Sequence, residues 1–123
     1  MKFAEDHNTS RYKITGYDNT SIGINGIAHN QSLVLSPMEL IIDWSPQSYS
    51  QLEAEHLDPF YDLNAEIILL GTGQIQLFPQ SDILRRFAKE QIGFEIMDTQ
   101  AACRTFNILM AEGRNVVAGL FIV

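Results

Sequence analysis

The sequence of 123 residues is poor in cysteine and in long apolar runs. Cys103 is its single cysteine, which excludes an internal disulfide framework and a Cys-x-x-Cys redox or zinc site. No apolar run approaches the roughly 18 residues that a membrane span requires. The first residues have no apolar signal core and are acidic where a transit peptide would be basic. We therefore expect a cytoplasmic protein with no membrane insertion, in keeping with the low cysteine content.

Basic residues are missing from most of the first half of the chain. Residues 14–84 carry nine acids and no Lys or Arg, for a charge of −9, whereas residues 1–13 and 85–123 each carry +1, which together give −7. Nucleic-acid binding depends on clustered Lys and Arg, so this distribution argues against it. An acidic face instead favours electrostatic steering toward a basic protein partner.

Short β-type runs fill the first half. Residues 12–17, 21–24, 32–35 and 39–43 alternate or are apolar, and tight turns separate them. Asn25-Gly26 is the strongest hairpin signal in the chain. Residues 50–64 predict an acidic connector with one or two helical turns, because Pro59 prevents a long helix.

In the second half of the chain, the apolar residues follow a different spacing, with helical segments between the strands. Residues 67–70 predict a strand buried on both faces and ended by Gly71, and residues 75–78 predict extended chain. A helix is expected from a cap at Ser81 or Asp82 to about Gln91, then a strand over 94–97. A second helix, capped by Asp98 or Thr99, precedes a final strand over 116–123.

This order predicts the α/β class and one domain over residues 1–123. Right-handed crossovers make the C-terminal β-α-β-α-β half a set of three neighbouring parallel strands in a mixed β-sheet. The N-terminal section supplies β-hairpins, and we expect residues 1–11 to be loosely held unless they add an edge strand. An exposed β edge in that section also offers a weak homodimer contact.

Four spaced motifs resemble one small family. They are Gly71-Thr72-Gly73, Met97-Asp98-Thr99, the run from Ala101 to Leu109, and Glu112-Gly113-Arg114. Together they resemble the Mth-domain family of unknown function, which includes the third assembly factor of mitochondrial complex I and the adipogenesis-associated Mth-domain protein. The resemblance implies an α/β fold with a β-hammerhead-like N-terminal section. It implies no catalytic residue. We also expect no cofactor.

Candidate binding residues gather where the parallel strands end. Gly71, Thr72 and Gly73 either let backbone N–H groups approach an anion or serve close packing and positive φ. A dinucleotide fingerprint fails, because Gln76 stands where its third glycine belongs. Asp98 and Thr99 open a helix that faces the same crevice, or they are a plain N-cap.

The helix that follows offers further candidates. Arg104 and Asn107 share one face and could reach a carboxylate, or they form an intramolecular salt bridge and satisfy a loop carbonyl. Cys103 is more simply a small buried residue than a nucleophile. The three histidines show no spacing for metal ligands, and there is no Gly-x-Ser-x-Gly elbow.

The sequence thus favours a non-enzymatic protein-interaction or assembly-factor module. The alternative is a small-molecule or anion-binding protein, enzyme or not, with a pocket at the C-terminal ends of the parallel strands. Its expected lining is Gly71, Thr72, Gly73, Asp98, Thr99, Arg104 and Asn107.

Overall fold

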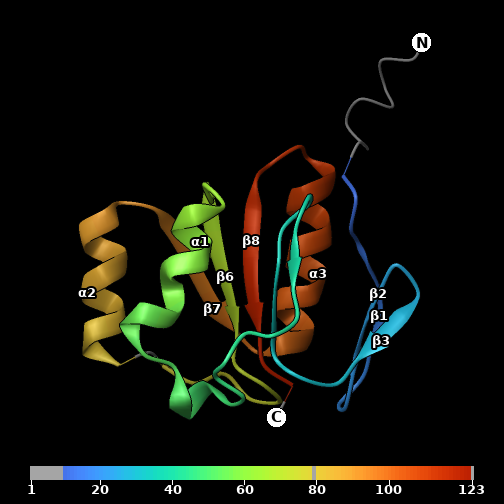
Figure 1. Cartoon of the computed structure of the whole chain (residues 1–123), viewed down its shortest axis with the longest axis horizontal. Coiled ribbons are helices and arrows are strands. Elements are labelled where there is room, and N and C mark those ends of the chain that lie inside the picture. Colours follow the sequence, from blue (N-terminus) through green and yellow to red (C-terminus); the bar gives the residue numbers. More distant parts are fainter. Residues whose placement is uncertain (1–9, 79, 123) are drawn as a thin grey trace.

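A five-stranded mixed sheet forms the centre of the protein in a computed structural model that describes residues 10–78 and 80–122 (Figure 1). Its strand order is β5-β4-β8-β6-β7. The strands are β4 (Leu33–Leu35), β5 (Leu40–Ile41), β6 (Ile67–Gly71), β7 (Gly93–Met97) and β8 (Val116–Leu120). Because β6 pairs in parallel with both β7 and β8, while β4 joins β8 antiparallel, the predicted mixed α/β sheet is confirmed.

The N-terminal hairpins form a second sheet. Strands β1 (Ile14–Tyr17), β2 (Ile22–Ile24) and β3 (Ile27–His29) pair antiparallel in the order β1-β2-β3. The predicted turn at Asn25-Gly26 is confirmed, with φ of 52° and 83° at the two residues. Positive φ at both positions suits the tight two-residue hairpin that this dipeptide favours. These three strands stand beside the central sheet rather than inside it.

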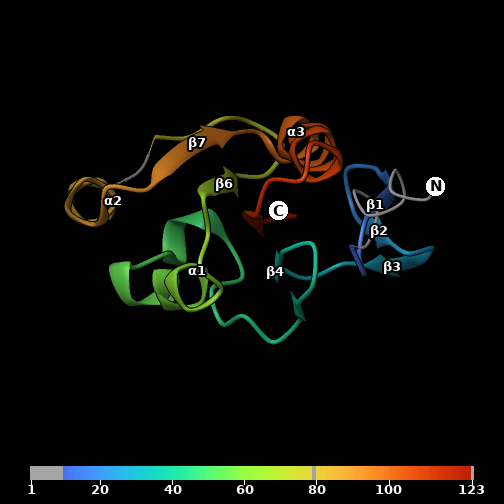
Figure 2. The ribbon, with the colours of Figure 1, turned by 90° about the horizontal axis from the view of Figure 1, so that it is seen from above.

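Helical segments cover both faces of the central sheet (Figure 2). Two 3-10 turns, Tyr49–Gln51 and Ala54–Leu57, lead into the short α1 (Asp58–Asp62) on one face. Helix α3 (Thr99–Ala111) covers the other face, and α2 (Ser81–Glu90) lies beyond β7 at the edge. Pro59 stands in the first turn of α1, where its missing N–H costs nothing.

Some local expectations need correction. Helix α2 begins at Ser81 with Gln80 as its N-cap residue, and Asp82 instead accepts a bond from the N–H of Ile83 (3.0 Å). The last strand, expected over 116–123, ends at Leu120 in β8, and residues 75–78, expected to be extended, join no sheet. Residues 1–9, which we expect to be loosely held, and Val123, which we expect in the last strand, lie outside the described residues.

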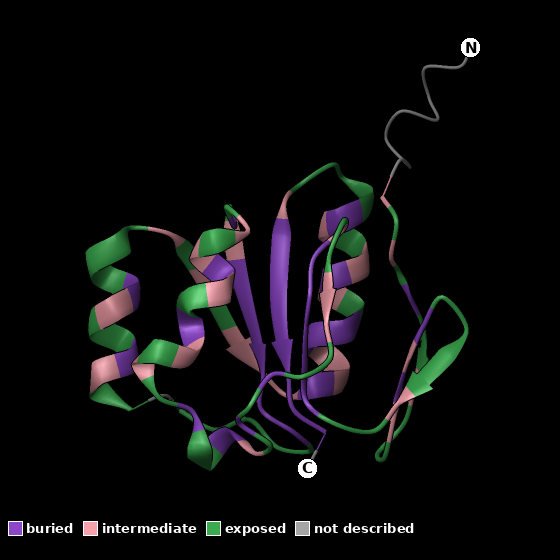
Figure 3. Ribbon diagram, in the orientation of Figure 1, coloured by how far each residue is buried: buried purple, intermediate pink, exposed green. Residues whose placement is uncertain are grey.

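The core has two parts, one on each face of the sheet, and buried residues follow β6 and β8 through its centre (Figure 3). Leu69 packs in the cluster with Phe106 of α3, whereas Ile68 and Leu70 pack in the cluster with Phe60 of α1. Consecutive residues of one strand therefore face opposite layers, and all three are fully buried. This confirms that β6 is buried on both faces, as its unbroken apolar run predicts.

Candidate functional site

The end of β6 fits tightly against the start of α3, and Gly71 makes this possible. A Cβ atom placed on Gly71 would lie 2.9 Å from the Cα of Thr99 and 3.1 Å from the Cβ of Ala102. Its φ is not positive, so the need for glycine here is close approach rather than backbone conformation.

Thr72 and Gly73 organise the loop that follows. The hydroxyl of Thr72 donates to the carbonyl of Ile75 (2.6 Å) and accepts from the N–H of Leu77 (3.2 Å). Gly73 has a φ of 109°, a conformation that favours glycine. Its N–H donates to the hydroxyl of Thr99 (2.8 Å), and its carbonyl accepts from the N–H of Thr99 (2.8 Å).

Asp98 and Thr99 begin α3. The carboxylate of Asp98 accepts from the N–H of Ala101 (2.9 Å), the arrangement of an N-cap that contributes about 1 kcal/mol. The hydroxyl of Thr99 donates to the carbonyl of Phe121, which follows β8. Thr99 therefore joins the loop after β6, the residue after β8 and the start of α3, and its one side-chain polar atom is already bonded to both Gly73 and Phe121.

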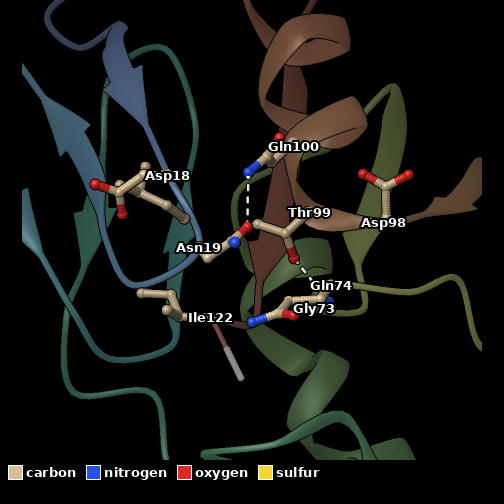
Figure 4. A pocket seen from close by; sticks show the side chains of 9 residues that line it. Asp18, Asn19, Gly73, Gln74, Asp98, Thr99, Gln100 and Ile122 are labelled. Carbon is tan, nitrogen blue, oxygen red and sulfur yellow. Dashed lines mark hydrogen bonds between the residues drawn. The ribbon is translucent and has the colours of Figure 1, made fainter.

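A hollow of about 180 Å³ opens between the first hairpin and the start of α3 (Figure 4). It is lined by Asp18, Asn19, Ile22, Gly73, Gln74, Asp98, Thr99, Gln100 and Ile122. The amide of Gln100 donates to the side-chain oxygen of Asn19 (3.2 Å) and joins the two walls. A single water molecule needs only about 10–15 Å³ of such space, so the hollow admits a small polar group.

The lining includes only part of the set expected from the sequence. Gly73, Asp98 and Thr99 line the hollow, whereas Gly71 and Thr72 are buried and Arg104 and Asn107 are absent from its wall. Six lining residues carried no signal as ligands: Asp18, Asn19, Ile22, Gln74, Gln100 and Ile122. The sequence Asp18-Asn19 indicates only a turn. The two residues reach the wall of the hollow because the hairpin sheet packs against α3.

The charge of the hollow is negative. Asp18 and Asp98 line it, and none of its lining residues is basic. The N–H (2.8 Å) and hydroxyl of Thr20, and next those of Ser21, donate to Asp18 and lower the pKa of its carboxyl. The carboxylate is thus ionised at neutral pH, and a neutral or cationic polar molecule fits the hollow better than the anion expected from the glycines.

Arg104 and Asn107 contact the hairpin sheet outside the hollow. The side-chain amide of Asn107 accepts from the N–H of Ile14 (3.1 Å) and donates to its carbonyl (2.7 Å). These two hydrogen bonds are of the kind that a neighbouring strand would make with β1. Arg104 is exposed and donates to the hydroxyl of Tyr17 (3.3 Å). Both side chains therefore join α3 to β1.

Cys103 is buried in the core beside these residues. Burial raises the pKa of its thiol to about 12, although the charge of Arg104 acts in the opposite direction. The thiolate, which is the reactive form, is negligible at neutral pH. In residues 10–78 and 80–122, no group of three or more His, Cys, Asp and Glu residues is placed to hold a metal ion.

The chain is similar in sequence to one protein family and to proteins of several organisms. Residues 14–121 match the profile of the family described as "Protein of unknown function (DUF498/DUF598)". A Francisella tularensis protein named "13 kDa major membrane protein" is 34% identical over 90 residues, which are 72% of each chain. The Danio rerio protein named NADH dehydrogenase (ubiquinone) 1 alpha subcomplex assembly factor 3 is 34% identical over 110 residues. Those residues are 87% of this chain but 62% of that relative.

Solved structures show the same fold. A crystal structure of a Bordetella parapertussis protein matches with a TM-score of 0.85 and 34% identity, covering 92% of this chain and 97% of the other. A solution structure from Bordetella pertussis, described as a Mth938-like domain, matches with a TM-score of 0.78 and 28% identity, covering 92% and 87%. Among the helices in the described part of this chain, none has the length and apolar character to cross a bilayer.

Proposed function

This chain belongs to the DUF498/DUF598 family of unknown function, and from that membership we propose that it is a non-enzymatic protein-interaction module of the assembly-factor type. The observation that carries the proposal is the similarity to complex I assembly factor 3 over 87% of the chain. The chain spans less than two thirds of that relative. As a more specific role, we propose that it takes part in the assembly of a respiratory complex. The name of the Francisella tularensis relative, a membrane protein, also supports work beside a membrane. The cytoplasmic location expected from the sequence is kept as part of the proposal.

An acidic surface on the α1 side of the sheet supports a basic partner. Its carboxylates are all exposed and belong to Glu53, Glu55, Asp58, Asp62 and Glu66. Asp58 pairs with Arg86 (2.7 Å) and Glu66 pairs with Arg114 (3.1 Å). The other three carboxylates make no ion pair within residues 10–78 and 80–122. Unpaired carboxylates on one face steer a basic protein into contact and lose this effect as salt rises.

Affinity capture tests this proposal. The tagged protein is recovered from its own cells at low and high salt, and a stoichiometric partner that is lost at high salt is expected. The double variant Glu55→Gln/Asp62→Asn should weaken capture several-fold at low salt, because each exposed charge contributes up to about 1 kcal/mol. The matched double variant Glu95→Gln/Glu112→Gln removes two exposed charges elsewhere and should leave capture unchanged. The proposal is contradicted if the amount of captured partner does not depend on salt, or if both double variants lose the same amount of captured partner.

The hollow supports a second candidate function, the binding of a small polar molecule. It lies beyond the C-terminal ends of β6 and β8 and at the start of α3, the usual ligand position in open α/β sheets. Its two carboxylates and three side-chain amides suit a ligand that carries an ammonium or amide group. Under this reading, Gly73, Asp98 and Thr99 shape the wall, while Asn19 and Gln100 contact the ligand.

A further inference from the structure

Large apolar side chains gather on the loop between β6 and α2. Phe78 is 86% exposed, Ile75 66% and Leu77 38%, and Leu84 on the first turns of α2 is 42% exposed. Four exposed apolar side chains within ten residues make a patch, and such patches on soluble domains mark contact surfaces. We call these four residues, with Arg85 and Lys89, the loop patch.

Polar contacts hold the loop in a shape that directs these side chains outward. The hydroxyl of Thr72 bonds to the backbone of both Ile75 and Leu77. The side-chain amide of Gln76 donates to the carbonyl of Ile96 on the edge strand β7 (3.0 Å). The polar groups of the loop thus face the protein, and its apolar side chains are left for an external surface.

The outward side of α2 adds positive charge. Ile83 and Phe87 are buried against the core, whereas Arg85 and Lys89 are exposed one turn apart. Arg86 points elsewhere, to Asp58 (2.7 Å). The loop patch therefore carries two cations, with the exposed acid Glu90 beside Lys89 at the end of α2, on a chain of net charge −7. Long basic side chains beside apolar ones are typical of surfaces that rest at a lipid interface.

We propose that the loop patch docks the protein peripherally on an anionic lipid bilayer, with Phe78 entering the interface and Arg85 and Lys89 contacting the headgroups. The inference rests on the proposed function, because it supplies the contact with the membrane beside which the module works. The strongly acidic remainder of the chain is repelled by anionic headgroups, so this patch is also the side that turns toward the bilayer.

Vesicle flotation tests the docking. The full chain should float with vesicles that contain about a third phosphatidylglycerol and much less with pure phosphatidylcholine. Phe78→Ser should lower vesicle affinity by about tenfold or more, because an aromatic ring leaves the interface. Arg85→Gln/Lys89→Gln should lower it by about thirtyfold at low salt, and this difference should fade at high salt. The matched controls Ile108→Ser and Arg11→Gln/Lys13→Gln change exposed residues elsewhere and should bind like the unaltered protein.

A fluorescent label reports the depth of contact. Because Cys103 is fully buried and its thiol pKa is raised to about 12, an environment-sensitive thiol label should react only with a new cysteine. Labelled Phe78→Cys should shift its emission to the blue when anionic vesicles are added, and labelled Ile108→Cys should not. Binding without this shift, no flotation of the unaltered protein, or unchanged flotation of Phe78→Ser overturns the inference.

The loop patch could instead hold a protein, and the same variants decide this. If Phe78→Ser releases the captured partner while vesicles never bind, the patch is a protein interface and the lipid inference fails. If vesicles fail but salt-sensitive capture through the acidic surface persists, only the docking is overturned. If capture fails while flotation holds, the interaction module is overturned and the docking stands.

Discussion

Gly71→Ala tests whether close approach of α3 to β6 controls the fold around the candidate site. The added Cβ would lie 2.9 Å from the Cα of Thr99, 3.0 Å from its Oγ1 and 3.1 Å from the Cβ of Ala102. Two of these atoms belong to the helix residue that also bonds to Gly73 and Phe121, so α3 must shift as a unit. Overpacking costs about 1–3 kcal/mol, and the backbone contact places this case near 2–3 kcal/mol.

Urea and thermal unfolding measure this loss. The midpoint in urea should fall by about 1–2 M with an unchanged slope, since one added methyl group barely alters the surface that unfolding exposes. The melting temperature should fall by roughly 6–15 °C, at about 3–5 °C per kcal/mol for a domain of this size. Gly16→Ala is the matched control, because a Cβ there meets nothing within 4 Å, and it should stay within about 0.5 kcal/mol of the unaltered protein.

A second substitution separates backbone from side-chain contact. Ala102→Gly removes the 3.1 Å contact but leaves the Cα of Thr99 in place. It also costs about 1 kcal/mol as glycine in a helix. The double variant Gly71→Ala/Ala102→Gly should therefore be no more stable than Gly71→Ala. A Gly71→Ala protein as stable as Gly16→Ala, or full rescue by Ala102→Gly, refutes the reasoning.

Two further predictions concern Cys103 and the hollow. The pKa of Cys103 is raised from 9.0 to about 12, so above pH 9 the unfolded thiol loses a proton that the folded thiol keeps, and the free energy of unfolding should fall from pH 9 toward 12. In urea titrations at several pH values, Cys103→Ala should make this fall in the free energy of unfolding shallower. Part of the fall should remain, because burial also raises the pKa of Tyr49 to about 12. An equally steep fall in Cys103→Ala would contradict the raised pKa of Cys103. In a thermal-shift screen, small ammonium and amide compounds should stabilise the unaltered protein more than inorganic phosphate does, and Gln100→Ala should lose the effect. Stabilisation by phosphate alone would contradict the negative charge of the hollow.

The sequence predicted those parts of the fold whose causes are local. Asn25-Gly26 specifies its hairpin because two adjacent residues carry the positive φ that the turn needs. Asp98 caps α3 through a bond three residues along the chain. The apolar run of β6 and the β-α-β-α-β order were enough to predict three neighbouring parallel strands.

The two glycines at the end of β6 show what a short window of sequence does not determine. At the strand end the sequence offers positive φ and close packing as equal reasons for glycine, and the structure divides them between two residues. Gly73 has the positive φ, and Gly71 has the close contact with α3. The contact involves Thr99, 28 positions further on, so no short window of sequence could have made the distinction.

The wall of the hollow was unpredictable for the same reason. Asp18 and Asn19 reach α3 only because the hairpin sheet stands apart from the central sheet and packs against that helix. Asn107 contributes to this placement by bonding both backbone groups of Ile14, a residue 93 positions away. Nothing in the local sequence indicates that an asparagine on a helix face will bond to the backbone of β1 as a neighbouring strand would. The candidate site therefore depends on a contact between two sheets and one helix, and variants on the hairpin should alter it as strongly as variants on the glycine-flanked strand end.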